Sequence, residues 1–471
     1  MCSSDLLRWE IYFPQTVTST GAGGFVDVAT GNVLVAGVGG IDSSMNVENS
    51  LKNFAPRLGV AYRWRQKTVI RMGYGRSFDI GVFGSIFGHS VTQNLPVLAR
   101  QQVQGADKFL SAFSLAPPGA PGFVFPTVPS SGQFPLPDGV NQFVQTKRMR
   151  LPTVDAWNLT VQREVTPSLT AEIGYVGNKG THVFAGNGPD YNCNQPSVVG
   201  FATGVSNSAR RPFFPKFGWT QDLRCHLEDA SNNYHALQTK VEKRFSHGYQ
   251  FLAHYTWAKA INFDGDYYNT DPKVNRGPND FNRAHVFVLV NLWELPVGKG
   301  KRFAGNISRM ADYLIGGWQV NAVTNWSSGL PFSPSYNECG NDRDTGPCRP
   351  DIVGNVQSGI SKNGWFTITS GPLATNGTTS GPWRRPQVGQ FGTAGRNSLY
   401  GPRFFNTDMS LFKNFVITER VRGQFRFEAF NFFNHVNLGT PSNCVDCSDG
   451  GKITSTAAPL RQLQFGLKFG F

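Results

Sequence analysis

Cysteine is the residue type whose spacing in this sequence most clearly offers chemistry. Apart from Cys2, the cysteines fall as three local pairs within stretches rich in Gly, Asn and Pro: Cys193 with Cys225, Cys339 with Cys348, and Cys444 with Cys447. Paired loop cysteines are typical of disulfides in an oxidising compartment. Free thiols remain open, as does a metal at Cys444 and Cys447, although a closed zinc site needs four ligands. We predict these three disulfides, all outside the cell.

Paired carboxylates are the second candidate for chemistry. Asp264 and Asp266 form one pair, and Asp342 and Asp344 form another. A hydrolase could use such pairs and calcium could bind them, but Asp is also an ordinary turn residue. The sequence contains no Gly-x-Ser-x-Gly elbow and no His-Glu-x-x-His motif. It therefore predicts no enzyme, no catalytic residue, no metal site and no cofactor.

The segments between these loops follow the two-residue period of β-strands with two unlike faces. The end of the chain is the clearest case, because Leu463, Phe465, Leu467, Phe469 and Phe471 alternate with polar residues and glycines. A second case runs from Val421 to Phe433. Each such segment is roughly ten residues long, as a tilted membrane strand requires, and longer than the average globular strand of about 5–6 residues.

The composition of the 471-residue chain agrees with a β-rich membrane protein. Hydrophobic residues make up 39% and charged residues 16%, while Phe alone occurs 38 times. Few aliphatic residues argue against a helical bundle, and many aromatic residues argue against disorder. No apolar run approaches the length of a membrane helix. The net charge of +13 comes from scattered cations, so we expect no nucleic-acid partner.

Short and long connections alternate along the chain. Tight turns are predicted at 66–67, 166–168, 246–248 and 416–420 and a longer turn at 296–312, whereas long connections cover about 79–153, 179–233, 261–283, 328–403 and 434–459. Outer-membrane barrels have short periplasmic turns and long extracellular loops. The sequence therefore predicts an all-β fold, an antiparallel up-and-down transmembrane β-barrel wall of about twelve strands beginning at 7–13. A soluble sandwich or a propeller would space its turns differently.

Several stretches resemble one family. They are "NFAPRLGVAYRW" with "KTVIRMGYGRSFD" (53–79), "NDFNRAHVFVLVNLWELPVGKGKRF" (279–303), "GRNSLYGPRFFNTDMSLFKNFVITERVRGQFRFEAFNFFNHVNLGTP" (395–441) and the terminal "LQFGLKFGF". Together they resemble TonB-dependent outer-membrane receptors of the Oar-like branch, over nearly everything after Leu7.

The resemblance implies a plugged barrel of about 22 strands in the outer membrane of a Gram-negative envelope. No stretch here resembles the plug or the motif that contacts TonB, so we expect residues 1–471 to be the C-terminal part of the barrel, with non-native residues at the start. The implied partners are outer-membrane lipid, the barrel-assembly machinery, TonB through the missing N-terminal part, and an unidentified ligand. The final alternation, Phe465, Leu467, Phe469 and Phe471, is implied to be an assembly signal.

The polar strand faces are expected to line the lumen. Ten charged residues would point inward: Arg63, Arg71, Glu172, Lys240, Glu242, Arg244, Asp408, Arg422, Arg426 and Glu428. They could form cross-strand ion pairs that hold the register, or they could dock the plug or the substrate.

Two functions remain open at this point. The first is energised uptake of a ligand too large for porins. The second is a passive pore or a surface-display barrel whose loops bind partners.

Overall fold

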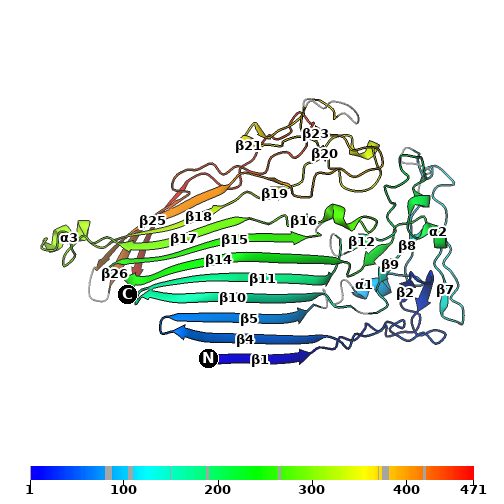
Figure 1. The fold of residues 1–471 in the computed structure, drawn as a ribbon, viewed down its shortest axis with the longest axis horizontal. Helices are drawn as coiled ribbons and strands as arrows, with labels where there is room; N and C mark the ends of the chain where they lie inside the picture. The colour runs from blue at the N-terminus through cyan, green and yellow to red at the C-terminus, as the bar shows by residue number, and fades with distance from the viewer. Residues whose placement is uncertain are drawn as a thin grey trace.

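Twelve long strands form one antiparallel sheet in which each long strand pairs with the next long strand along the chain (Figure 1). The short strand β16 (Gly277–Pro278) joins the same sheet by pairing with the end of β15. The computed structural model describes residues 2–79, 87–103, 105, 110–148, 150–186, 190–263, 267–369, 371–373, 381–416 and 421–470. We call the twelve strands the wall: β1 (Cys2–Trp9), β4 (Phe54–Arg65), β5 (Thr68–Phe78), β10 (Thr153–Thr166), β11 (Leu169–Val183), β14 (Ala230–Ser246), β15 (Tyr249–Asn262), β17 (His285–Glu294), β18 (Trp318–Ser327), β25 (Phe404–Val416), β26 (Arg422–Phe430) and β27 (Gln462–Gly470).

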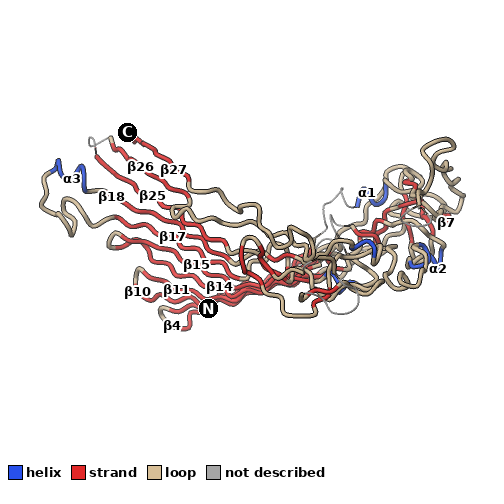
Figure 2. The backbone as a smooth tube through the Cα atoms, turned by 90° about the horizontal axis from the view of Figure 1, so that it is seen from above, coloured by secondary structure: helices blue, strands red, loops and turns tan. Residues whose placement is uncertain are grey.

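The wall is a curved, open sheet with β1 at one edge and β27 at the other (Figure 2). Within the described residues, these two edge strands pair only with β4 and β26. The predicted all-β fold with about twelve antiparallel strands is confirmed.

The first strand begins and ends earlier than predicted. It covers Cys2–Trp9 instead of 7–13, with Cys2 opposite Ala61 and Trp9 opposite Phe54. The chain leaves the sheet after Trp9, where the amide of Glu10 donates to the carbonyl of Asn53 at 3.0 Å, and Pro14 has no N–H to continue a ladder. The prediction of a strand through Phe13 was therefore wrong.

The register of the wall continues the two faces from strand to strand. Tyr62 lies opposite Ile70, Ile70 opposite Val161, and Val161 opposite Ile173. At the other edge, Phe427 lies opposite Phe465 and Phe425 opposite Leu467. Because side chains alternate between the two faces of a sheet, these pairs make one apolar face that extends across the wall.

Tight turns join the strands at one end of the wall. In the turn between β14 and β15, His247 and Gly248 have φ values of 53° and 77°. Two consecutive positive φ angles are what a two-residue hairpin turn requires, and glycine adopts such an angle without steric cost. The predicted turn at 416–420 lies largely outside the described residues. The turn at 296–317 is longer and contains helix α3 (Arg309–Ile315).

The described parts of the long connections lie toward the other end of the wall, and we call this region the cap (10–53, 79–152, 184–229, 263–284, 328–403 and 431–461). It contains the short helices α1 (Phe87–Thr92) and α2 (Phe214–Phe217), the 3-10 helices η1 (Ser208–Arg210), η2 (Pro272–Asn275) and η3 (Cys339–Asn341), and short strands: β2 (Gly24–Asp27), β3 (Asn32–Val35), β6 (Arg100–Gln101), β7 (Gln133–Pro135), β8 (Val140–Asn141), β9 (Phe143–Gln145), β12 (Tyr191–Asn192), β13 (Arg224–His226), β16 (Gly277–Pro278), β19 (Pro331–Phe332), β20 (Asp351–Ile352), β21 (Ser358–Ser361), β22 (Gly364–Phe366), β23 (Trp383–Arg384) and β24 (Leu399–Tyr400).

The apolar cores of the molecule lie mainly in the cap. One cluster surrounds Trp219, a second surrounds Trp383, and a third includes Phe25 and Met45. None of the described helices has the length and apolar character needed to cross a membrane.

Candidate functional site

The ten charged residues predicted for the lumen all lie on the same face of the wall by register, opposite the apolar face. Glu172 lies directly across from Lys240, and Arg71 lies across from Thr160. Arg63 and Arg244 stand near the tight-turn ends of β4 and β14, while Arg422, Arg426 and Glu428 follow β26. The structure therefore gathers these residues into one polar surface rather than into a single cluster.

Contacts on this polar face are those of a solvated surface. Arg71 donates from Nη1 to Oε1 of Gln162 at 2.6 Å, and Lys240 pairs with Glu242 at 2.8 Å. These side chains are partly or fully exposed, so each contact contributes at most about 1 kcal/mol. Asp408 has a different role, because it accepts from the amide of Asn431 at 2.8 Å just after β26 ends.

The last strand presents the predicted apolar row of the assembly signal. Leu463, Phe465, Leu467 and Phe469 are 56%, 66%, 60% and 46% exposed, respectively. Phe471 lies outside the described residues. Because β27 pairs on one side only within the described part of the chain, its apolar side chains and its free backbone groups both need a partner inside a membrane.

All three predicted cysteine pairs are joined in the structure. Cys193 is bonded to Cys225, Cys339 to Cys348, and Cys444 to Cys447. The first bond links the stretch after β12 to β13, and the other two belong to the part of the cap that contains Trp383. Cys444, Asp446 and Cys447 also lie within metal-ligand distance of one another, but both sulfur atoms are in the disulfide and offer no thiolate.

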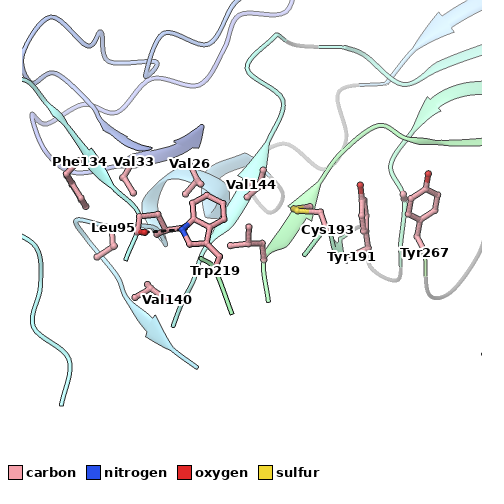
Figure 3. Packing of buried hydrophobic residues seen from close by; sticks show 14 of the residues in the cluster. Val26, Val33, Leu95, Phe134, Val140, Val144, Tyr191, Cys193, Trp219 and Tyr267 are labelled. Carbon is pink, nitrogen blue, oxygen red and sulfur yellow. Dashed lines mark hydrogen bonds between the residues drawn. A yellow bond between two sulfur atoms is a disulfide. The ribbon is translucent and has the colours of Figure 1, made fainter. Parts of the chain in front are cut away.

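The larger core of the cap is built around Trp219, which is 1% exposed. Its indole Nε1 donates to the carbonyl of Leu136 at 3.1 Å, and the ring lies among Val26, Leu95 and Val144 (Figure 3). These residues come from four different parts of the chain. The core therefore fixes the long connections relative to one another.

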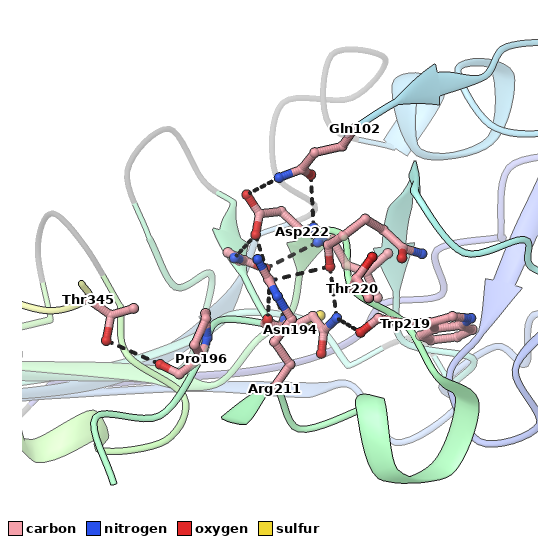
Figure 4. A network of polar contacts seen from close by, with 12 residues as sticks. Gln102, Asn194, Pro196, Arg211, Trp219, Thr220, Asp222 and Thr345 are labelled. Atoms are coloured by element: carbon pink, nitrogen blue, oxygen red, sulfur yellow. Dashed lines mark hydrogen bonds and ion pairs between the residues drawn. The ribbon is translucent and has the colours of Figure 1, made fainter. Parts of the chain in front are cut away.

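Beside this core lies a polar network centred on Asp222 (Figure 4). Its carboxylate accepts from Arg211 Nη1 at 2.7 Å and from Gln102 Nε2 at 3.0 Å, and its amide donates to Gln102 Oε1 at 2.9 Å. Arg211 also donates to the carbonyl of Asn194 at 2.6 Å. The Arg211 side chain is 2% exposed, so this ion pair and its hydrogen bonds hold Gln102 firmly in place.

Gln102 also lines an open pocket of about 390 Å³ on the cap. The lining is polar and mostly uncharged: Gln101, Gln102, Asp138, Ser206, Asn207, Ser208 and Thr220, with Val103, Gly105 and Gly139. Asp138 already accepts from the amide and hydroxyl of Thr220 at 2.7 and 2.9 Å. Asn207 Oδ1 is buried and has no hydrogen-bond partner among the described residues. The pocket thus offers amide and hydroxyl groups. The sequence did not predict this pocket.

A serine, a histidine and an aspartate also meet in the cap. Ser90 Oγ lies 2.7 Å from Nδ1 of His226, and His226 Nε2 lies 3.7 Å from Asp190. Ser90 is 1% exposed, which leaves no path for a substrate. Asp190 pairs with Arg224 at 2.5 Å. Burial opposes ionisation of Asp190, but the contacts with His226 and Arg224 lower its pKa overall. This trio stabilises the packing of β13.

Glu228 is a buried acid near the loop end of β14. Burial raises the pKa of its carboxyl to about 7, although the hydroxyl of Thr146 donates to both oxygens at 3.3 and 3.2 Å. The sequence around Glu228 did not predict a buried acid, because the segments that bury this side chain lie far away along the chain.

The candidate carboxylates Asp342 and Asp344 do not form a joint site. Asp342 accepts from Arg385 Nε at 2.8 and 2.9 Å and from the hydroxyl of Tyr336 at 2.8 Å. Asp344 pairs with Arg210 at 2.5 Å, and this contact joins the 184–229 connection to the 328–403 connection. Both carboxylates therefore brace the cap. Asp264 and Asp266 lie outside the described residues.

The family profile that matches this chain agrees with this arrangement. The family profile described as "Outer membrane beta barrel domain" matches residues 7–464. Solved structures that resemble the chain include the outer membrane transporter YddB from Escherichia coli (10% identity, TM-score 0.43, covering 89% of this chain and 40% of that one). Another is the ferric citrate transporter FecA in its unliganded form (10%, 0.39, 90% and 38%). A third is the pyoverdine outer membrane receptor FpvA from Pseudomonas aeruginosa PAO1 bound to pyoverdine (8%, 0.39, 93% and 38%).

A two-faced antiparallel wall with short turns on one rim and long connections on the other defines an outer-membrane β-barrel protein. The chain belongs to the family of outer-membrane β-barrel domains, and its location is the outer membrane. It spans about two fifths of the solved transporter and receptor chains named above. No curated protein sequence matches it.

Proposed function

We propose that residues 1–471 form the C-terminal part of a TonB-dependent receptor barrel of the Oar-like type, which imports a ligand too large for porins. The outer edges of β1 and β27, which pair with no other strand among the described residues, carry this proposal. Inside hydrocarbon each unpaired backbone group costs several kcal/mol, so the wall needs further strands. Strands encoded before Met1 would complete a wider barrel of about 22 strands, which has room for a plug.

The pocket on the cap supports the same proposal and narrows the ligand class. Its amides and hydroxyls favour a ligand with many hydrogen-bonding groups, such as a glycan, a peptide or a chelate rich in amides. The pocket lies on the extracellular rim, where an incoming ligand first meets the receptor. The lumen charges would then contact the ligand or the plug. TonB would supply energy through the N-terminal part.

Uptake in the native host tests this function. Cells would receive a ferric siderophore mixture, cyanocobalamin, a maltodextrin series or a peptide mixture as the limiting nutrient. We expect loss of growth on one of them when the gene that contains this chain is deleted, and the same loss when TonB is deleted. Growth that needs this gene but not TonB would instead identify a passive pore. No dependence on either gene with any nutrient would contradict transport.

A substitution that fills the pocket tests the ligand site. Ser208→Trp places a large side chain in the pocket and should lower uptake of the identified nutrient at least tenfold. Ser448→Trp, on an exposed part of the cap away from the pocket, is the matched control and should leave uptake unchanged. Equal uptake by both variants would show that the ligand binds elsewhere.

A surface-display barrel is the second candidate function. The folded, disulfide-bonded cap favours it, because a cap with its own core can bind partners without transport. Adhesion of cells to host or neighbouring cells that is lost with the gene and unaffected by TonB would support this alternative.

A further inference from the structure

One turn on the short-turn rim differs from the other turns that the structure describes. The turns at 66–67, 167–168 and 247–248 contain two residues each, whereas the turn between β17 and β18 covers 295–317 and includes α3. We call residues 296–317 the basic turn. It contains Lys299, Lys301, Arg302 and Arg309 but only one acid, Asp312. Figure 1 shows α3 projecting beyond the strand ends, away from the cap.

The basic turn exposes a row of large apolar side chains. Met310 and Leu314 are 79% and 74% exposed, and Tyr313 is 38% exposed. Residues three and four positions apart lie on the same face of a helix, so these three side chains form one apolar stripe on α3. Phe303, 55% exposed, adds a fourth apolar group.

Hydrogen bonds fix the basic turn to the apolar side of the wall. Trp318 and Lys413 lie opposite each other in the register, in the same face as Val320 and Leu411. Trp318 Nε1 donates to the carbonyl of Leu314 at 3.0 Å, and Lys413 Nζ donates to the carbonyl of Gly316. The C-terminal end of α3 is therefore held on the face of the wall that meets lipid.

The cations of the basic turn are available to a partner. Lys299, Arg302 and Arg309 are exposed and make no ion pair with any described residue, whereas Lys301 lies 3.5 Å from Glu294. The aspartate is occupied within the turn, because Asp312 Oδ1 accepts from the amide of Lys299 at 2.6 Å. Arg302 and Arg309 lie over the rings of Phe303 and Tyr313. The turn therefore presents positive charge that no described acid neutralises, next to exposed apolar groups.

We propose that the basic turn is an interfacial anchor that binds the anionic phospholipid surface on the periplasmic side of the outer membrane. A segment with an apolar stripe and flanking Lys and Arg lies in the headgroup region with its apolar side chains in the acyl boundary. Two observations select lipid as the occupant. The C-terminal end of α3 is hydrogen-bonded to Trp318 and Lys413 on the apolar side of the wall, and the cations beside the exposed apolar side chains, apart from Lys301, have no acidic partner among the described residues. Arginine and lysine stems reach the headgroups while their apolar parts stay in the boundary.

Spin labelling of the intact protein in lipid nanodiscs tests the position of the stripe. In a Cys2→Ser background, which removes the one cysteine outside the disulfides, labels are placed at Leu314→Cys and at Asn306→Cys. We expect the label at 314 to be accessible to oxygen dissolved in the bilayer and shielded from an aqueous nickel complex. The label at 306, on an exposed part of the same turn, should show the reverse. A label at 314 that is fully accessible to the nickel complex would overturn the proposal and leave the stripe free for a periplasmic protein.

Charge reversal tests the preference for anionic lipid. Each cation near an anionic surface contributes about fivefold to binding. K299E/R302E should therefore lower the enrichment of phosphatidylglycerol over phosphatidylcholine around the purified barrel at least fivefold. The control variant K273E/K362E changes the net charge by the same amount, but on the cap. It should leave the enrichment within about twofold of that of the unmodified protein. Heat-modified migration on gels verifies that both variants keep the barrel. Equal enrichment for both folded variants would refute the anchor, whatever the outcome of the uptake experiments.

Discussion

In the wall, Phe465 and Trp257 expose 66% and 57% of their surface, whereas in the cap Trp219 and Trp383 expose 1% and 0%. The same residue types thus face outward in one region and inward in the other. Water is the solvent around the cap, so burial of apolar area drives its packing. Lipid surrounds the wall, so exposed apolar side chains cost nothing there, and backbone pairing determines its structure. The two regions of this chain are therefore stabilised in two different solvents, water and lipid.

The largest effect should come from the core of the cap. Trp383→Ala removes a buried ring that packs against Phe366 and whose Nε1 donates to the carbonyl of Thr367 at 2.7 Å. Such a truncation costs about 3–5 kcal/mol, so proteases added outside the cell should cut the cap much faster while the wall stays protected. Trp257→Ala, on the lipid face, should leave the cleavage rate of the cap unchanged. Equal protease sensitivity of the cap in the two variants would contradict the proposed difference between the wall and the cap.

The disulfides should differ according to the length of chain that they close. Cys193 and Cys225 are separated by 32 residues, whereas Cys444 and Cys447 are separated by 3. The chain-entropy estimate gives about 4 kcal/mol for the first bond and about 2 kcal/mol for the second. Replacing both cysteines of each pair by serine should therefore raise protease sensitivity more for Cys193/Cys225. Recovery of free thiols from unreduced native protein would contradict the disulfides themselves.

Titration of Glu228 should make the stability of the cap depend on pH. The carboxyl has a pKa of about 7 in the folded state and about 4.3 when unfolded. The folded state therefore holds the proton more tightly, and the stabilisation that is complete below about pH 4 is lost as the pH rises through 7. Trp fluorescence during unfolding in urea should give a higher midpoint at pH 5 than at pH 8. Glu228→Gln should flatten this part of the profile, and an unchanged profile would reject the assignment.

The smallest effect should come from the polar face of the wall. Arg71→Ala removes the 2.6 Å bond to Gln162, which joins β5 to β10 at an exposed position. A double-mutant cycle with Gln162→Ala should give a coupling below about 1 kcal/mol. A coupling of several kcal/mol would show that these residues are excluded from water, as in a closed and filled lumen.

The wall could be predicted from the sequence because its pattern is local. Alternating residues such as Phe425 and Phe427 identify a two-faced strand without reference to any other segment, and the turn at His247 and Gly248 sets the pairing of its two neighbours. The beginning of the first strand could not be predicted in this way. Its limits depend on pairing with β4 and on the contact between Glu10 and Asn53, which lie far apart along the chain.

The cysteine pairs were predictable from the sequence in part, less directly than the strands but more directly than the limits of the first strand. Their grouping within single connections was visible in the sequence, and the structure joins the same pairs. By contrast, the pocket lined by Gln102, Asn207 and Thr220 had no sequence signal. Its residues are common in loops, and Gln102 is more than one hundred positions away from Asn207 and Thr220 along the chain.

The sequence by itself determined that this protein contains a wall of two-faced membrane strands. The two-residue period and the length of each strand are local properties that can be read from consecutive residues. Only the tertiary structure decided that Trp219 and Trp383 are buried, that Glu228 lies away from water, and that Met310 and Leu314 of α3 are exposed. Those properties depend on which distant segments exclude solvent from a side chain. Solvent exclusion is a collective result of packing, and no short stretch of residues encodes it alone.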